Sequence, residues 1–91
     1  MATSNVTIDN DGWQDIITEG SLTLTDGDVY TITVLANGES EVCIADSKPA
    51  DDFKGHPVKA NINFGFTYHT GDAIWVRLNA MAADEATVVI S

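Results

Sequence analysis

The most constraining feature of this sequence is the alternation of apolar and polar side chains in short runs. Residues 29–35 show it clearly, because Tyr30, Ile32 and Val34 share one face of an extended chain while threonines occupy the other. Apolar residues rarely recur at the spacing of three and four that an amphipathic helix requires. Valine, isoleucine and threonine are plentiful, and these residues favour pleated, half-buried strands. The sequence therefore predicts an all-β protein.

Turn signals divide the chain into about seven to eight short strands at intervals of roughly 8–12 residues. The clearest are Asp26-Gly27 and Asn37-Gly38, because glycine readily takes the positive φ that two-residue hairpin turns require. This spacing predicts one antiparallel β-sandwich domain over residues 1–91, of the jelly-roll or immunoglobulin-like kind. Residues 1–8 are expected to form an edge strand or a flexible arm. The expected strands are residues 4–8, 13–18, 21–25, 29–35, 41–45, 60–69, 73–78 and 87–90.

Residues 46–58 interrupt the pattern. They contain both prolines of the chain together with lysines and aspartates, and they show no alternation. We therefore expect a long loop here. Long loops in compact domains are frequently functional, so this one is a candidate contact surface, with Phe53 and His56 as its candidate contact residues.

The charge of the chain limits its partners. Fourteen acidic residues against four basic ones give a formal net charge of −10, and residues 1–52 contain eleven of the acids. Nucleic acids and anionic membranes attract basic surfaces, so we expect this chain to bind neither. Two interpretations of the acidity remain open. It keeps a free chain soluble, or it matches a basic surface on a protein partner.

The N-terminal residues contain neither the basic region nor the apolar run of a signal peptide, and no stretch approaches the ~20 apolar residues of a membrane span. Cys43 is the only cysteine, so an intrachain disulfide cannot form. We therefore expect synthesis in a reducing cytoplasm. The start at Met1 and the lack of linkers favour a free-standing protein over a module of a longer chain.

Catalytic and metal-binding patterns are weak. Cys43 lies inside an expected strand and is interpreted as a small buried hydrophobe, while His56 and His69 show no zinc-ligand spacing with it. Residues 9–12 begin like a calcium loop, but their glycine is misplaced and the distal glutamate is missing. Asp51-Asp52 is an equally weak calcium candidate. We expect no enzyme activity, no metal and no cofactor.

Two expected strands are apolar on both faces. In residues 73–78, the even-numbered side chains would fill the core, which points Trp75 and Arg77 the other way. Val89 similarly faces away from its neighbours in residues 87–90, and Trp13 adjoins polar residues. An exterior tryptophan beside an arginine is typical of protein interfaces. We therefore predict a contact face containing Trp75, Arg77 and Val89, with Trp13 nearby. The alternative places Trp75 in the core or under the long loop.

The order of four short motifs is also informative. They are Trp13-Gln14-Asp15-Ile16, Asp26-Gly27-Asp28-Val29-Tyr30-Thr31-Ile32, Asp46-Ser47-Lys48-Pro49 and Gly71-Asp72-Ala73-Ile74-Trp75-Val76-Arg77. In this order they span most of residues 13–91 and resemble small tailed-phage virion proteins of the head-decoration, head-fibre or tail-associated kind. The chain departs from that pattern at residues 79–85, where an alanine-rich stretch replaces the usual polar turn.

The resemblance implies a structural protein present in many copies on a virion, often as a trimer, and bound to the major capsid protein or other virion proteins. We therefore predict a capsid decoration, or cement, protein that bridges neighbouring capsid subunits. The alternative is a glycan- or protein-binding sandwich module of a fibre or tail. Such a module would use Trp13, Trp75 or Tyr68 as a stacking platform.

Overall fold

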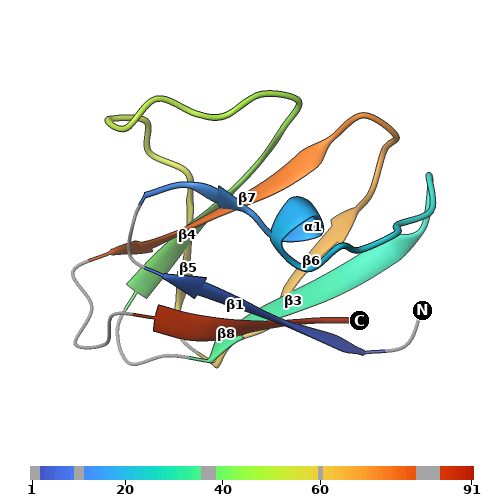
Figure 1. The fold of residues 1–91 in the computed structure, drawn as a ribbon, viewed down its shortest axis with the longest axis horizontal. Coiled ribbons are helices and arrows are strands. Elements are labelled where there is room, and N and C mark those ends of the chain that lie inside the picture. The colour runs from blue at the N-terminus through green and yellow to red at the C-terminus, as the bar shows by residue number, and fades with distance from the viewer. Residues whose placement is uncertain (1–2, 10–11, 36–38, 60, 80–84) are drawn as a thin grey trace.

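The computed structural model describes residues 3–9, 12–35, 39–59, 61–79 and 85–91. These residues form eight strands and one short helix, and Figure 1 labels all of them except β2. The elements are β1 (Ser4–Asp9), β2 (Gln14–Asp15), α1 (Ile16–Glu19), β3 (Val29–Leu35), β4 (Glu39–Ala45), β5 (His56–Lys59), β6 (Phe64–Thr67), β7 (Ala73–Asn79) and β8 (Glu85–Ile90).

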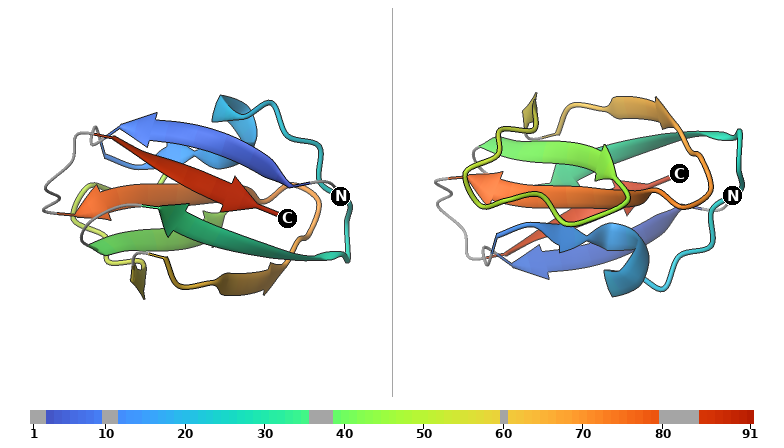
Figure 2. Two further views of the ribbon diagram at one scale, coloured as in Figure 1. Left: turned by 90° about the horizontal axis from the view of Figure 1, so that it is seen from below. Right: turned by 90° about the horizontal axis from the view of Figure 1, so that it is seen from above.

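The strands form two four-stranded antiparallel sheets that face each other. Sheet A has the order β1-β8-β3-β6 and sheet B the order β2-β7-β4-β5, and Figure 2 shows them from opposite sides. The first strand pairs with the last, the second with the seventh, the third with the sixth and the fourth with the fifth. This is a long hairpin wrapped into two sheets, the arrangement of a jelly roll. The predicted all-β sandwich is confirmed, in its jelly-roll form.

The core lies between the inner faces of the two sheets, where alternation directs every second side chain. On β3 these are Tyr30, Ile32 and Val34, and on β7 they are Ile74, Val76 and Leu78. The same period applies to β1 and β8. The buried apolar residues are Val6, Ile8, Trp13, Ile16, Tyr30, Ile32, Val34, Val42, Val58, Phe66, Ile74, Val76, Leu78, Ala86, Val88 and Ile90.

The strand expected at residues 13–18 is wrong beyond Asp15. Asp15 accepts a hydrogen bond from the backbone N–H of Ile17 at 3.0 Å and another from the hydroxyl of Thr18 at 2.8 Å. These bonds cap the first turn of α1, which turns the fully buried Ile16 into the core. Residues 21–25 also differ from the expectation, because they lie outside both sheets.

The expectations for residues 46–69 need two further corrections. The end of the predicted loop is β5, which pairs with β4, and Pro57 is tolerated there because β5 is an edge strand. The strand expected over residues 60–69 is confined to β6, and Asn61 takes a positive φ before it. The expected turns at residues 10–12 and 37–38 and the alanine-rich residues 79–85 fall wholly or partly outside the described residues.

Candidate functional site

The predicted contact residues do not form one surface. Trp75 and Arg77 lie on β7 in sheet B, whereas Val89 lies on β8 in sheet A. The outer faces of the two sheets point in opposite directions, so a single contact face shared by β7 and β8 is wrong. The cause is topological, because the chain crosses from one sheet to the other between these two strands.

The outer face of sheet B brings together Trp13, Arg77 and Glu41. Arg77 is directly opposite Glu41 in the pairing of β7 with β4, and Trp13 immediately precedes β2 on the other side of β7. The guanidinium carbon of Arg77 lies 4.5 Å from the centre of a Trp13 ring, within the range of a cation–π contact. Its Nη2 also donates to Oε2 of Glu41 at 2.7 Å. One arginine therefore links β7 to β4 and to the residue that precedes β2.

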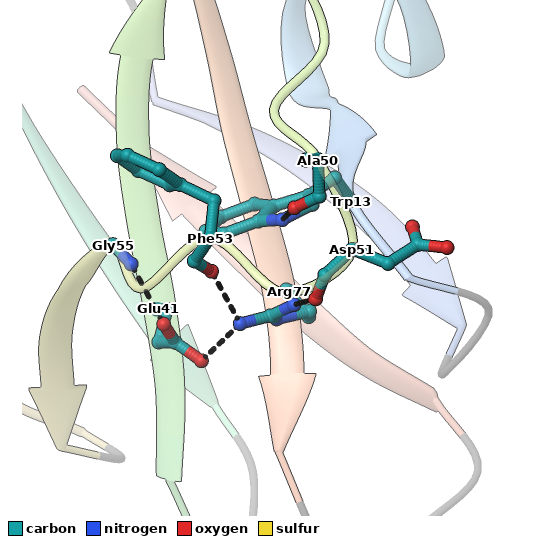
Figure 3. A network of polar contacts seen from close by, with 7 residues as sticks. All are labelled: Trp13, Glu41, Ala50, Asp51, Phe53, Gly55 and Arg77. Atoms are coloured by element: carbon teal, nitrogen blue, oxygen red, sulfur yellow. Dashed lines mark hydrogen bonds and ion pairs between the residues drawn. The ribbon is translucent and has the colours of Figure 1, made fainter.

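These three side chains hold the backbone of residues 46–55, named here the anchored loop. Figure 3 shows Arg77 donating to the carbonyl oxygens of Asp51 and Phe53, the latter at 2.9 Å. Glu41 accepts from the backbone N–H of Gly55 at 2.7 Å, and the indole of Trp13 donates to the Ala50 carbonyl at 3.3 Å. Four backbone groups of a loop without regular structure are thus bound by side chains from the sheet.

The ion pair at the centre of this network is largely removed from water. The side chains of Arg77 and Glu41 are only 12% and 7% exposed. Burying charges is costly unless their remaining donors and acceptors find partners, and the loop carbonyls and the Gly55 N–H supply most of them. Among the described residues, Nε of Arg77 is buried without a hydrogen-bond partner. The pair and the loop therefore depend on each other.

The anchored loop lies directly against the sheet at Gly55. A Cβ at this position would lie 2.7 Å from Cη2 of Trp13 and 2.8 Å from the carbonyl oxygen of Val42. Real Cβ atoms essentially never come so close to other atoms, so only glycine fits without displacing the indole or the backbone. This close approach explains why Trp13, which adjoins polar residues in sequence, is only 2% exposed.

The other side of the anchored loop faces solvent. Phe53 is 47% exposed, and Figure 3 shows its ring directed away from Trp13 and Arg77. Asp51, Asp52 and Lys54 beside it are exposed as well. An ordered backbone therefore presents one large apolar side chain among charged ones. The predicted contact residue His56 lies further along, exposed on β5, with its ring centre 5.1 Å from that of Phe64.

The remaining candidates show no catalytic arrangement among the described residues. Cys43 lies on β4, opposite Trp75 of β7. Desolvation by burial raises the pKa of its thiol, which disfavours the nucleophilic thiolate. Nδ1 of His69 is 4.0 Å from a carboxylate oxygen of Asp26. Within the described ranges, no three His, Cys, Asp or Glu side chains are grouped to hold a metal ion.

The tryptophans and Arg77 are mostly engaged within the domain. Trp13 lies under the anchored loop, so its ring is not available as the stacking platform that a glycan-binding module would need. Trp75 is half-buried on the same face, and its indole donates to the Ala45 carbonyl at 3.2 Å. Arg77, predicted as a contact residue, donates hydrogen bonds to Glu41 and to two carbonyl oxygens of the loop.

Sequence reasoning missed Glu41 and Gly55. Both are essential to the anchored loop, yet each has ordinary neighbours in the sequence. Glu41 lies at an outward position of a strand, where an acid normally faces water. Its partner is 36 residues away, and only the pairing of β4 with β7 brings the two together. A lysine-glycine-histidine segment likewise gives no sign that an indole lies against it.

No family model matches the sequence, and neither a curated protein nor a solved structure is significantly similar to it. Within the described residues, no helix has the length and apolar character needed to cross a membrane.

Proposed function

We propose that this chain is a non-catalytic structural protein that binds other proteins, specifically a decoration protein of a phage capsid. The observation that carries the proposal is the anchored loop. A buried ion pair and a buried tryptophan fix its backbone, while Phe53 remains exposed at its surface.

Such a loop suits tight contact with a partner for two reasons. Ordering a loop opposes binding, and a loop that is already fixed in the free protein avoids most of that cost. Aromatic side chains, phenylalanine included, are enriched in protein interfaces relative to the rest of the surface. Asp51 and Asp52, both exposed beside Phe53, would suit a partner surface that is basic around an apolar depression.

The capsid part of the proposal draws on three further points. The motifs resemble those of small phage virion proteins, and jelly rolls are frequent among capsid domains. The net charge of −10 would keep a free protein soluble until it reaches the capsid. Because one fold hosts many functions, the proposal has to be tested by binding. The fibre or tail module remains the alternative, and it would use the same loop to bind a different virion protein.

The test is co-sedimentation with shells assembled from the major capsid protein encoded in the same genome. Phe53→Ala should weaken binding at least about tenfold, equivalent to about 1.4 kcal/mol, because it removes the apolar centre of the surface. The matched control is Ile62→Ala, which removes an exposed apolar side chain (58% exposed) outside the anchored loop. This control should bind like the unmodified protein, and both variants should retain its melting temperature.

Two results would contradict the proposal. The first is shell binding that Phe53→Ala and Ile62→Ala change equally, since the anchored loop would then have no special role. The second is an unmodified chain that does not sediment with any shell from its own genome. Binding to a purified fibre or tail protein, lost in Phe53→Ala, would instead support the alternative.

A further inference from the structure

The two sheets differ in how their edges are protected. Sheet B ends on one side with the two-residue β2 and on the other with β5, which contains Pro57 and Lys59. Short strands, proline and lysine are the usual devices that prevent edge-to-edge pairing. Sheet A ends with β1, which has six residues and contains neither proline nor a basic residue. β1 itself therefore carries none of these devices.

The hydrogen bonds of Asp9 show which backbone N–H and carbonyl groups of β1 point away from β8. Its N–H donates to Oε1 of Gln14 at 3.1 Å, and its carbonyl accepts from Nε2 of the same side chain at 2.7 Å. Asp9 therefore turns its backbone groups away from β8. Because these directions alternate along an antiparallel strand, Asn5 and Thr7 turn theirs away from β8 as well.

A second pairing gives the same result independently. Thr31 and Ser91 exchange two backbone hydrogen bonds, of 2.8 and 3.0 Å, next to the pairing of β3 with β8. By alternation, Thr87 and Val89 on β8 also turn toward β3. Their partners on β1, which are Thr7 and Asn5, therefore receive no bonds from β8.

The free part of the edge is consequently short and well defined. Gln14 occupies the outward groups of Asp9 and so ends the open edge there. Among the described residues, the outward N–H and carbonyl groups of Asn5 and Thr7 have no hydrogen-bond partner. Both side chains are exposed, so a second strand would find two neighbouring outward residues ready to pair.

Charge favours a second copy of this chain as the added strand. The strands of sheet A contain only two charged residues, Asp9 and Glu85, which are opposite each other at one end. Elsewhere its outer face presents mainly threonine, asparagine and valine. Two copies with a charge of −10 repel each other, and this sheet is where they can approach with the least repulsion. A basic partner would gain little from so neutral a surface.

We propose that two copies of this chain dimerise by pairing β1 with β1 in an antiparallel manner, around a two-fold axis at Val6. Asn5 of each copy then exchanges backbone hydrogen bonds with Thr7 of the other copy. Sheet A becomes continuous across the dimer, with its outer face on one side throughout. The dimer does not depend on the proposed capsid role, and it leaves the anchored loop on sheet B uncovered.

This register is the one in which the two free residues of one copy are opposite the two free residues of the other. Side chains on the same face must be opposite each other, so the register can shift only in steps of two. A shift in one direction pairs Asn5 with Asp9, whose backbone groups Gln14 already binds. A shift in the other direction pairs Asn5 with itself and leaves Thr7 opposite Thr3. With the axis at Val6, Asp9 is opposite Thr3 and no acid faces another.

The test is sedimentation velocity over a series from about 1 to about 500 µM, in which dimerisation appears as a mass that rises with concentration. Thr7→Pro removes one outward N–H without removing a bond to β8, and proline is tolerated at such edge positions. It should raise the dissociation constant at least tenfold. The matched control is Thr67→Pro on β6, the other edge of sheet A, which should leave the dimer unchanged.

Amide hydrogen exchange measured by NMR on the unmodified chain provides a second test, which does not require Thr7→Pro to fold. The amides of Asn5 and Thr7 in the unmodified chain should exchange fast when dilute and slowly when concentrated, whereas amides facing β8 should stay protected throughout. A monomer over the whole series would overturn the proposal. So would a dimer that Thr67→Pro dissociates and Thr7→Pro does not, because the contact would then be at β6. Phe53→Ala, the variant that tests the proposed function, should not affect dimerisation. The dimer and the proposed function can therefore fail independently of each other.

Discussion

The two sheets of this jelly roll have equally regular inner faces and very different outer ones. The outer face of sheet B carries Trp75, Arg77 and Glu41, and the anchored loop covers part of it. The outer face of sheet A is rich in threonine and free of charge except at one end, and the loop residue Asn63 accepts a hydrogen bond there from Thr33 at 2.6 Å. The apolar and ionic side chains on sheet B are therefore structural, because a loop is attached to them.

The contacts that stabilise the domain therefore involve different groups from those that are available to bind a partner. The contacts that fix the domain beyond its core are concentrated on sheet B, where removal of one side chain leaves buried partners without bonds. Groups that remain available for partners include Phe53 above sheet B and the β1 edge of sheet A. Substitutions at matched positions on the two sheets should consequently have very different effects on the free energy of unfolding.

The largest difference is expected for Arg77→Ala. It leaves the Glu41 carboxylate buried without its cation and frees two loop carbonyls, which should lower the free energy of unfolding by about 3–5 kcal/mol. The matched change on sheet A is Thr87→Ala, which should lower it by less than about 1 kcal/mol. Urea denaturation followed by tryptophan fluorescence measures both values.

The double variant with Arg77→Met and Glu41→Met sharpens this prediction. It removes both charges together, so it should be more stable than Arg77→Ala alone. Equal losses in Arg77→Ala and Thr87→Ala would show that the ion pair does not hold the anchored loop.

A smaller difference is expected between two glycines. Gly55→Ala places a methyl group against the Trp13 indole and the Val42 carbonyl, which should destabilise the domain by about 1–3 kcal/mol. At Gly65 on β6, a Cβ would find its nearest neighbour at 4.0 Å, so Gly65→Ala should be neutral or stabilising by about 0.5 kcal/mol. Thermal unfolding of both variants measures this difference. A harmless Gly55→Ala would mean that the loop lies further from the sheet.

The smallest effect concerns the Cys43 thiol on sheet B. Its pKa is raised above the ordinary 9.0 by desolvation, so it should react with iodoacetamide more slowly at neutral pH than an unfolded control. A raised pKa means that the folded state holds this proton more tightly. The corresponding stability is therefore present below pH 9.0 and is lost as pH rises through the folded pKa.

A matched thiol on sheet A tests the comparison. V89C in a Cys43→Ser background places a half-buried thiol on the outer face of sheet A. It should react faster than Cys43 at the same pH. Slower reaction at position 89 would show that the outer face of sheet A is the more protected of the two.

Several elements were predictable from the sequence because their own residues specify them. The clean alternation in residues 29–35 corresponds to β3, the apolar residues 73–78 correspond to β7, and the turn glycine Gly27 takes a positive φ as expected. Residues 13–18 were misassigned, because a local bond from Asp15 favours a helical turn over a strand. The short β5 within the expected loop has no alternation to reveal it, and only pairing with β4 makes it a strand.

The sequence by itself determined an acidic all-β domain with its core on one face of each strand, because a period of two and glycine turns are local properties. Only the tertiary structure decided which strands share a sheet, since pairing joins residues far apart in the chain. The strand pairing places Trp75 and Arg77 in a different sheet from Val89. It also brings Arg77 into contact with Trp13 and Glu41. It also left the backbone groups of Asn5 and Thr7 at an open edge, because nothing in β1 itself says which neighbour it lacks.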